Sequence, residues 1–462
     1  MDLSGKTRKA LLIAFAVETL SSTWCLKLHG WTPVFSILYL FSGVSIALFL
    51  LRLPELHLPA PGKKPWRSNA IQRSAILIGL TALALYSWCL YWFDEFPIDI
   101  TNADMLPIIK VMAERFLAGQ HSHVYDPIPA IWHGAQPIYL PAMWLPYVPA
   151  IALGIDMRWV AIAGLLFAFG AFIALYKPSG PASGSTSRSA SHPPSGSRPA
   201  FYLGVLAFLL FWWIAADNTP GIISVSEEGV VIGYYALLTL ALVSGKPWLT
   251  GIAICLCMLS RYALIGWIPA YVVWLILEKR TRQLSIVSLT GILCFVLIFL
   301  VPVGWVTFTR LAYLPENYIS FAGRVWKDSP DVFSTAPGLA WFFGRNGTAI
   351  LHGLLIVLSF SLPMVFTIAA FLRRRANIPL AALKLSLVVF YCFIDVPYLY
   401  LFYTSSFVSL IILALALRDS PAPRDSPKTR DSPAPQDSPK TQDSPAPRDR
   451  LPPTAQGTGQ AT

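Results

Sequence analysis

The chain consists mainly of long apolar runs separated by short polar segments. The runs lie near residues 10–26, 33–53, 74–93, 137–155, 157–176, 200–216, 229–245, 248–277, 284–308, 348–372 and 380–417. A helix needs about 20 apolar residues to cross a bilayer, and most of these runs have that length. The runs at 248–277 and 380–417 are long enough for two helices each. The pattern predicts an all-α polytopic membrane protein with about 11–13 transmembrane helices.

Composition agrees with this prediction and narrows the class of protein. The 462 residues are 55% hydrophobic and 13% charged, whereas an ordinary soluble domain is about 25% charged. A soluble enzyme, a disordered chain and a disulfide scaffold are therefore excluded. The net charge is +11, but the basic residues form short clusters between apolar runs, which is typical of cytoplasmic loops rather than of a nucleic-acid surface. The six cysteines all lie in apolar runs, where cysteine usually acts as a small hydrophobe.

The placement of charge predicts an orientation in the membrane. Basic clusters at the N-terminus and in 52–73, 279–282 and 373–375 are expected to face the cytoplasm. The acidic segment 94–136 is expected outside, in the plasma membrane or the inner membrane of a bacterium. Linker 177–199 is basic, which conflicts with a simple count of crossings. The conflict disappears if one run between 137 and 216 is short or re-entrant and 248–277 forms two helices.

Three parts of the chain are expected. Residues 1–73 form a two-helix membrane segment, and 74–417 form the main transmembrane domain. The main domain contains outer loops 94–136 and 309–347 and the linker 177–199, which is rich in Ser, Gly and Pro and is predicted to be flexible. Residues 418–462 repeat a six-residue unit such as RDSPAP without apolar side chains, so this tail is predicted to be disordered.

The segment 94–147 carries the strongest chemical signal. Within it, residues 105–118 alternate apolar and polar side chains at helical spacing, and Gly119 follows at the position of a helix C-terminal cap. This spacing predicts an amphipathic helix on the membrane surface. Asp104 stands at its start. Its carboxylate either caps the first helical turn or acts as a catalytic base at the membrane face.

Short motifs in this segment resemble a known family. In order they are Asp104, the AERFLAG of 113–119, Tyr125-Asp126-Pro127, Tyr139-Leu140-Pro141 and Pro146. This order resembles the first outer loop of the GT-C superfamily of membrane glycosyltransferases. It is most similar to the polyprenyl-phosphate-mannose-dependent mannosyltransferases, glycosyltransferase family 87 and its relatives. Residues 226–280 resemble the later part of the family pattern, but Glu227-Glu228 and Arg261-Tyr262 replace the Gly-Gln and Lys-Pro often found there.

The resemblance implies that the chain transfers a sugar, mannose in that branch, from a polyprenyl phosphate to the hydroxyl of a lipid-linked or glycan acceptor. Asp104 would be the general base, and the anomeric centre would be inverted. From their own positions, Arg261 in an apolar run and Arg324 and Lys327 in outer loop 309–347 are candidate ligands of the donor phosphate, although loop 309–347 could also be an ordinary solvated loop. The candidate substrate contacts are Asp99, Asp126, Tyr139 and Glu228. The expected partners are a lipid-linked sugar donor, a glycan or glycolipid acceptor and membrane lipids, without nucleic acid.

Several of these residues also have simpler explanations. Arg261 interrupts an apolar run, where a charge costs roughly 2.5–3.5 kcal/mol on insertion scales. It either binds the lipid phosphate or faces water in a turn between two short helices. Glu228 either binds acceptor hydroxyls or ends a helix. Glu18, within the first span, has no partner that the sequence identifies.

Two further hypotheses are a metal site and a transport function. His121, His123 and Asp126 could hold a divalent metal, but His-x-His spacing in a loop is a weak signal, so no metal and no cofactor is predicted. A transporter or lipid flippase is the alternative to an enzyme. Such proteins usually contain inverted repeats with charged residues at corresponding places, and no such symmetry is visible in this sequence.

Overall fold

The computed structural model of the chain describes residues 3–25, 27–58, 79–80, 83, 86–131, 134–175, 202, 204–207, 209–210, 225–329, 331 and 336–417. Throughout these residues the regular structure is helical, apart from one isolated antiparallel bridge between Ile128 and Ala135. The predicted all-α class is therefore confirmed. The linker 177–199, residues 59–73 and the tail 418–462 lie outside the described residues.

Most of the helices lie within the predicted apolar runs, and others lie in the predicted outer loops 94–136 and 309–347. Their bounds are α1 Leu3–Trp24, α2 Thr32–Leu50, α4 Met105–Leu117, α5 Pro141–Trp144, α6 Val148–Ala152, α7 Arg158–Leu175, α9 Glu228–Ser244, α10 Pro247–Met258, α11 Trp267–Leu277, α12 Thr281–Phe295, α13 Val301–Val303, α14 Trp305–Arg310, α15 Leu314–Asp328, α16 Ala340–Phe343, α17 Thr348–Leu372, α18 Ile378–Phe393 and α19 Leu401–Leu417. A π-helical turn, Val296–Leu300, joins α12 to α13.

Four helical segments are long and apolar enough to cross a membrane. They are α2, α7, the continuous segment 281–303 and α17. Five shorter apolar helices, of 10–17 residues, accompany them. These segments indicate a multi-pass membrane protein. The number of 11–13 spans stays a prediction, because the runs at 74–93 and 200–216 are described only in part.

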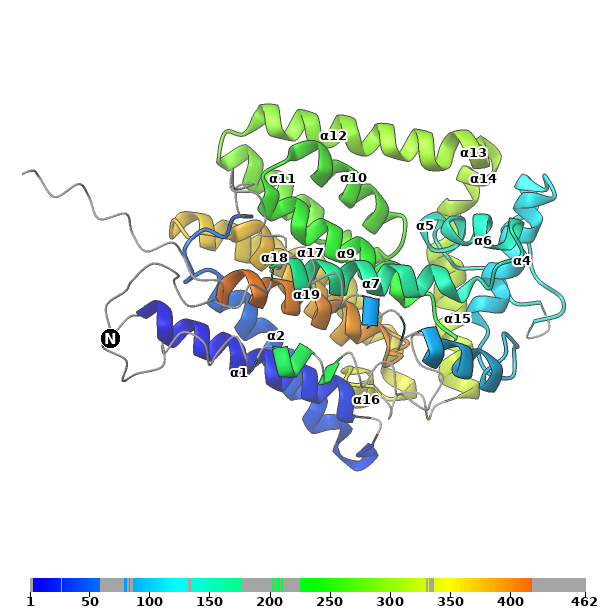
Figure 1. Cartoon of the computed structure of the whole chain (residues 1–462), viewed down its shortest axis with the longest axis horizontal. Coiled ribbons are helices and arrows are strands. Elements are labelled where there is room, and N and C mark those ends of the chain that lie inside the picture. The colour runs from blue at the N-terminus through cyan, green and yellow to red at the C-terminus, as the bar shows by residue number, and fades with distance from the viewer. Residues whose placement is uncertain are drawn as a thin grey trace, which may run out of the picture. The chain divides into compact units, whose positions relative to one another are not determined.

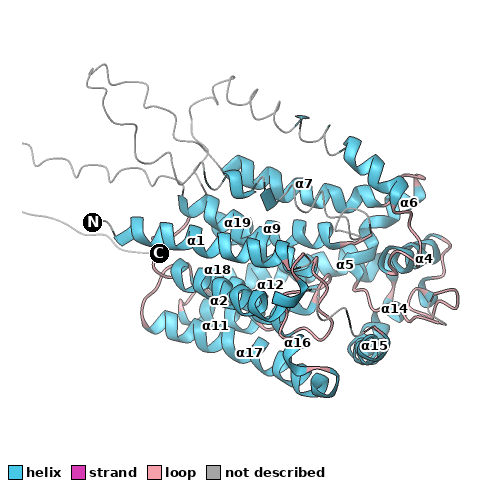
Figure 2. Cartoon of the chain, turned by 90° about the horizontal axis from the view of Figure 1, so that it is seen from below, coloured by secondary structure: helices cyan, strands magenta, loops and turns pink. Residues whose placement is uncertain are grey.

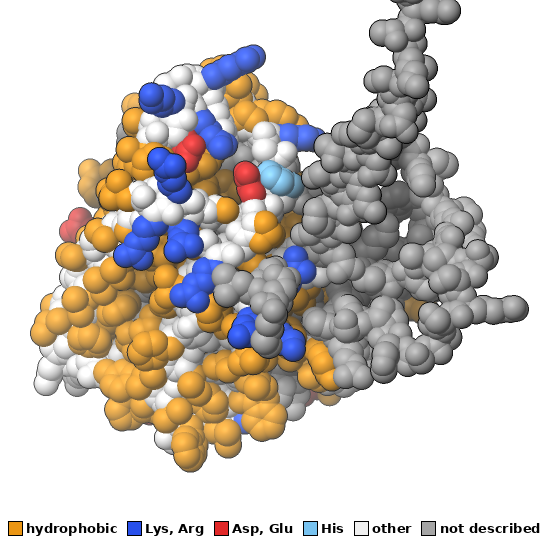
Figure 3. Space-filling view, turned by 90° about the vertical axis from the view of Figure 1, so that its left-hand side faces the viewer, with side chains coloured by type: hydrophobic (Ala, Val, Ile, Leu, Met, Phe, Trp, Pro, Cys, Tyr) orange, Lys and Arg blue, Asp and Glu red, His pale blue; other side chains and the backbone are white. Residues whose placement is uncertain are grey.

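The long helices run side by side, and their connections gather at two opposite ends of the bundle (Figures 1 and 2). One end contains the turns 245–246, 278–282 and 373–377; we call it the basic end, because Lys and Arg side chains gather on it (Figure 3). The other contains the segments 94–157, 259–266, 304–347 and 394–400, and we call it the loop end. The predicted basic clusters at 279–282 and 373–375 thus share one end, opposite the acidic segment.

The run at 137–155 does not form a single crossing helix. Pro141, Pro146 and Pro149 lie at the starts of α5, a 3-10 turn and α6, which have four, three and five residues. These pieces stay at the loop end, and α7 then leads the chain to the basic end (Figure 1). The run at 248–277 likewise forms two helices, α10 and α11. Both features match the arrangement expected from the charge pattern.

The N-terminal helices belong to the same core as the rest of the bundle. Glu18 of α1 and Lys384 of α18 are both fully buried and form an ion pair, N···O 2.5 Å. Ser405 and Ser409 of α19 donate hydrogen bonds to the same carboxylate, at 3.2 and 2.8 Å. Lys384 is thus the partner of Glu18 that the sequence did not identify.

Candidate functional site

The predicted surface helix is present as α4, and Gly119 behind it has a left-handed backbone, φ +73°. Asp104 occupies the N-cap position of α4, but its side chain makes no capping hydrogen bond to the first turn. It is half-buried. The catalytic interpretation of Asp104 stays a prediction.

The charge of Asp104 acts on two tyrosines. Burial, and then the charge of Asp104, raise the pKa of Tyr139 and of Tyr398. Glu227 acts on Tyr139 in the same direction. The hydroxyl of Tyr400 donates a hydrogen bond to Met105 Sδ at 2.7 Å. The segment containing Tyr139 and the segment 394–400, far apart in sequence, therefore both reach the start of α4.

Arg261 lies in the break between α10 and α11 and pairs with two carboxylates. Its Nη2 is 2.8 Å from Glu227 Oε1 and 2.5 Å from Glu228 Oε2. Thr404 donates a hydrogen bond to the other oxygen of Glu228 at 2.5 Å. Both glutamates are buried, and Arg261 is 17% exposed. The cluster contains one cation and two carboxylates, so it has no excess positive charge. A phosphate bound by Arg261 would therefore also lie close to the negative charge of the two glutamates.

Two polar atoms of this cluster are buried without a hydrogen bond to any described residue: Glu227 Oε2 and Arg261 Nε. A buried polar group without a partner destabilises the fold. Such groups are expected where a protein binds a polar ligand or water. The cluster therefore has unused capacity for one further donor and one further acceptor.

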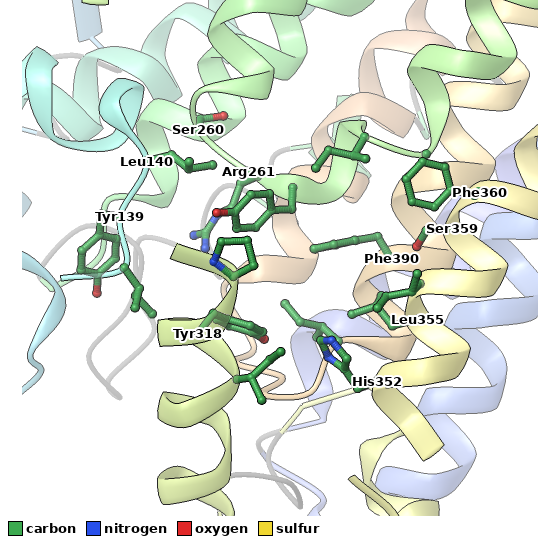
Figure 4. A pocket seen from close by; sticks show the side chains of 18 of the residues that line it. Tyr139, Leu140, Ser260, Arg261, Tyr318, His352, Leu355, Ser359, Phe360 and Phe390 are labelled. Atoms are coloured by element: carbon green, nitrogen blue, oxygen red, sulfur yellow. The ribbon is translucent and has the colours of Figure 1, made fainter. Parts of the chain in front are cut away.

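A cavity of about 280 Å³ opens beside Arg261. Its wall is mainly apolar and contains few polar side chains (Figure 4); these are Tyr139, Ser260, Arg261, Tyr262, Tyr318, His352 and Ser359. They come from the 136–140 segment, the 259–266 break, α15 and α17. An apolar cleft with a few convergent polar groups is the usual form of a small-molecule site.

His352 and Asp395 form a pair at this cavity that sequence reasoning missed. His352 Nδ1 lies 2.5 Å from Asp395 Oδ2, and Asp395 Oδ1 is buried without a hydrogen-bond partner among the described residues. The backbone carbonyl of Asp395 accepts a hydrogen bond from Trp326 Nε1 at 2.7 Å. Burial raises the pKa of Asp395, although His352 opposes the shift. A histidine in an apolar run and an acid beside a helix break were the available signals.

The other candidates lie apart from the cavity. Arg324 and Lys327 are exposed on α15 and do not belong to the cavity wall. Asp99 is exposed and accepts a hydrogen bond from the backbone N–H of Thr101 at 2.8 Å, and hydrogen bonds from Thr101 lower its pKa. Asp126 is half-buried and pairs with His123 Nδ1 at 2.6 Å. Of the eight candidates, Tyr139 and Arg261 thus line the cavity, Glu228 contacts Arg261, and the charge of Asp104 acts on Tyr139.

The histidine-rich part of the outer segment does not form a three-ligand cluster. His123 contacts Asp126, whereas the ring of His121 packs edge-on against Phe116. His133 lies outside the described residues. Among the residues that the structure describes, no group of three His, Cys, Asp or Glu side chains is placed to hold a metal ion.

Arg115 organises the loop that follows α4. Its guanidinium donates hydrogen bonds to the backbone carbonyls of His123, Asp126 and Pro127 at 3.1, 2.6 and 3.0 Å. Thr307 of α14 donates to the carbonyl of His121. These contacts hold the segment 120–127 between α4 and α14.

Searches with family models, among curated proteins and among solved structures find no match for this chain.

Proposed function

We propose that the chain is an integral-membrane glycosyltransferase that moves a sugar, mannose by its resemblance to GT-C enzymes, from a polyprenyl phosphate to an acceptor hydroxyl. The observation that carries this proposal is the position of Tyr139. Besides burial, the charges of both Asp104 and Glu227 raise the pKa of Tyr139, and its side chain lines the apolar cavity. The charge of the candidate base and the charges of the Arg261 cluster therefore both influence one tyrosine at the edge of a cleft that suits a lipid chain.

The proposed reaction needs a base and a stabilised leaving group. The acceptor oxygen attacks C1 of the sugar while the C1–O bond to the phosphate breaks, and the acceptor proton passes to the Asp104 carboxylate. The polyprenyl phosphate leaves with the electron pair of the broken bond. Because attack and departure occur on opposite faces of the sugar, the anomeric centre is inverted. The oxocarbenium character of such a transition state favours nearby carboxylates.

The departing phosphate requires a cation or a hydrogen-bond donor. The charge of Arg261 is already balanced by Glu227 and Glu228, so we assign His352 a share of this role. Asp395 binds Nδ1 of the imidazole, which leaves Nε2 for a ligand in the cavity. Arg324 and Lys327 are proposed to attract the donor at the surface of α15 rather than to contact it inside the cavity.

The test is transfer of labelled mannose from polyprenyl-phosphate-mannose by purified protein. Asp104→Asn is expected to lower the rate by at least about a hundredfold, which is typical for loss of a general base. Glu114→Gln is the matched control, because Glu114 is exposed on the same helix, where it pairs with Lys110 at 4.0 Å. Equal rates for wild type and Asp104→Asn would refute the assignment of the base.

A transporter is the second candidate, and the Glu18–Lys384 pair favours it, because charged groups inside a bundle often mark ion pathways. Against this function, the ammonium group of Lys384 and the hydroxyls of Ser405 and Ser409 already contact both carboxylate oxygens of Glu18. The cavity beside Arg261 does not include these residues. Failure to transfer a sugar from any lipid phosphate, together with lipid translocation in proteoliposomes, would favour transport.

A further inference from the structure

The basic end contains a second cavity, of about 520 Å³. It lies beside the turn between α11 and α12 and the turn between α17 and α18. Its wall is formed by Glu278, Phe371, Leu372, Arg374, Arg375 and Ile378. None of these residues lines the cavity at the loop end. The wall therefore combines two guanidinium groups with an apolar edge, and the proposed glycosyl transfer does not use it.

The surroundings of this cavity have a strong excess of positive charge. Six exposed basic residues occupy the two turns: Lys279, Arg280, Arg282, Arg373, Arg374 and Arg375. None of them takes part in an ion pair between described residues, and Glu278 is the one acidic residue of the wall. Lys and Arg side chains gather on this face of the molecule (Figure 3). This charge is not balanced within the described part of the chain.

The backbone of both turns adds a second observation. Helices α11 and α17 end in the same cap, in which Lys279 and Arg374 adopt left-handed φ values of 56° and 49°. The N–H of the next residue, Arg280 or Arg375, bonds back to the helix at 2.8 and 3.0 Å. The neighbouring helix α9 ends with Gly245 in this conformation, φ 65°.

Glycine adopts the left-handed conformation readily, whereas other residues adopt it at a conformational cost. A cation is attracted to a helix C-terminus from any position in the last turn. This attraction therefore does not explain why Lys279 and Arg374 occupy the left-handed position itself. A non-glycine residue that adopts an unfavourable backbone conformation is a reason to look for a function. Here the side chain of Arg374 lines the cavity.

We propose that this cavity binds the headgroup of an anionic phospholipid. The planar guanidinium groups of Arg374 and Arg375 match the oxygens of a phosphate diester. The apolar edge, where Leu372 is 74% exposed, then contacts the first carbons of the acyl chains. Basic pockets between transmembrane helices on the cytoplasmic side are suited to such headgroups. A free phosphate ion has the same anionic group but would leave the apolar edge uncovered.

The experiment measures binding of fluorescent phosphatidylglycerol to the full chain in neutral detergent, with phosphatidylcholine as the uncharged comparison. Arg374→Gln/Arg375→Gln is expected to weaken phosphatidylglycerol binding about thirtyfold, because each basic group near an anionic lipid strengthens binding roughly fivefold. The control Lys110→Gln/Arg310→Gln removes the same charge from exposed positions at the loop end. It should leave binding unchanged.

Two further measurements distinguish the possible ligands. Inorganic phosphate at concentrations matched to the lipid should fail to displace it; full displacement would overturn the lipid headgroup in favour of free phosphate. Equal losses in both double variants would mean unspecific attraction and would also overturn the site. If the glutamine variant does not fold, Arg374→Lys/Arg375→Lys retains the charge and tests the bidentate contact. Wild-type binding that does not weaken with added salt would contradict the proposal as well.

Discussion

Lys384 Nζ lies 2.5 Å from Glu18 Oε1, and both side chains are fully buried among α1, α18 and α19. The ammonium group also donates a hydrogen bond to Ser405 Oγ at 2.6 Å. A buried pair of this kind is satisfied only while both charges are present. The pair therefore holds α1 against α18 and α19, although 366 residues separate Glu18 from Lys384.

Removing one member of this pair is expected to destabilise the bundle strongly. Lys384→Met leaves Glu18 buried without its cation, which typically costs about 3–5 kcal/mol. The double variant Glu18→Leu/Lys384→Met removes both charges and should regain most of the loss. Thermal unfolding in detergent measures both. A double variant as unstable as the single one would mean that the pair is not the source of the effect.

The Arg261 cluster predicts an order among three variants. Arg261→Gln leaves two buried carboxylates without a cation and should lower thermal stability most. Glu227→Gln should cost less, because Arg261 keeps its 2.5 Å contact with Glu228. The double variant Arg261→Gln/Glu228→Gln should be more stable than Arg261→Gln alone, because it removes one of the two unpaired charges. The reverse order would show that Arg261 is not held by these carboxylates.

The sequence predicted the elements of the fold better than their contacts. Apolar runs give the helices, and Gly119 correctly predicts the end of α4, because both signals are local. The ion pairs of Lys384 and of His352 join residues 366 and 43 positions apart, and no local pattern encodes them. For the site, Asp104 and Tyr139 came from short motifs, whereas the partners of Arg261 depend on how α9 packs beside the 259–266 break.

The His352–Asp395 pair predicts a dependence of stability on pH. Burial raises the pKa of Asp395 above its ordinary value of 3.8, so the folded state favours the protonated acid. Its stabilising contribution is fully present below 3.8 and is lost as the pH rises through the raised value. Wild type should therefore lose melting temperature relative to Asp395→Asn as the pH rises above 3.8.

Asp99 provides a comparison of opposite sign. Hydrogen bonds from Thr101 lower its pKa, so its contribution is present above the ordinary aspartate value and is lost as the pH falls through the lowered value. Asp99→Asn should therefore change the pH profile in the opposite direction to Asp395→Asn, and only slightly, because Asp99 is exposed.

For Asp395, pH profiles of melting temperature that run parallel in wild type and Asp395→Asn would contradict the assignment of the pH dependence to this residue.

The crossing of α7 and α9 predicts a steric effect with an internal control. A methyl group at Gly164 would overlap the backbone carbonyl of Gly229, and one at Gly229 would overlap that of Ala161. Small residues at such positions allow two helices to approach closely. Gly164→Ala should therefore cost about 1–3 kcal/mol as the helices separate or strain. Gly170 lies in the same helix, and no described residue lies within 4 Å of a Cβ added there. Gly170→Ala should therefore be neutral or stabilising, because alanine favours a helix by up to about 1 kcal/mol over glycine. Melting temperatures in one detergent compare the two substitutions directly. Since both add the same methyl group to α7, a similar change in both would refute the close contact.

Because Glu227 and Glu228 directly precede Gly229, separation of these helices should also displace the carboxylates that hold Arg261. Loss of sugar transfer is then expected for Gly164→Ala and not for Gly170→Ala.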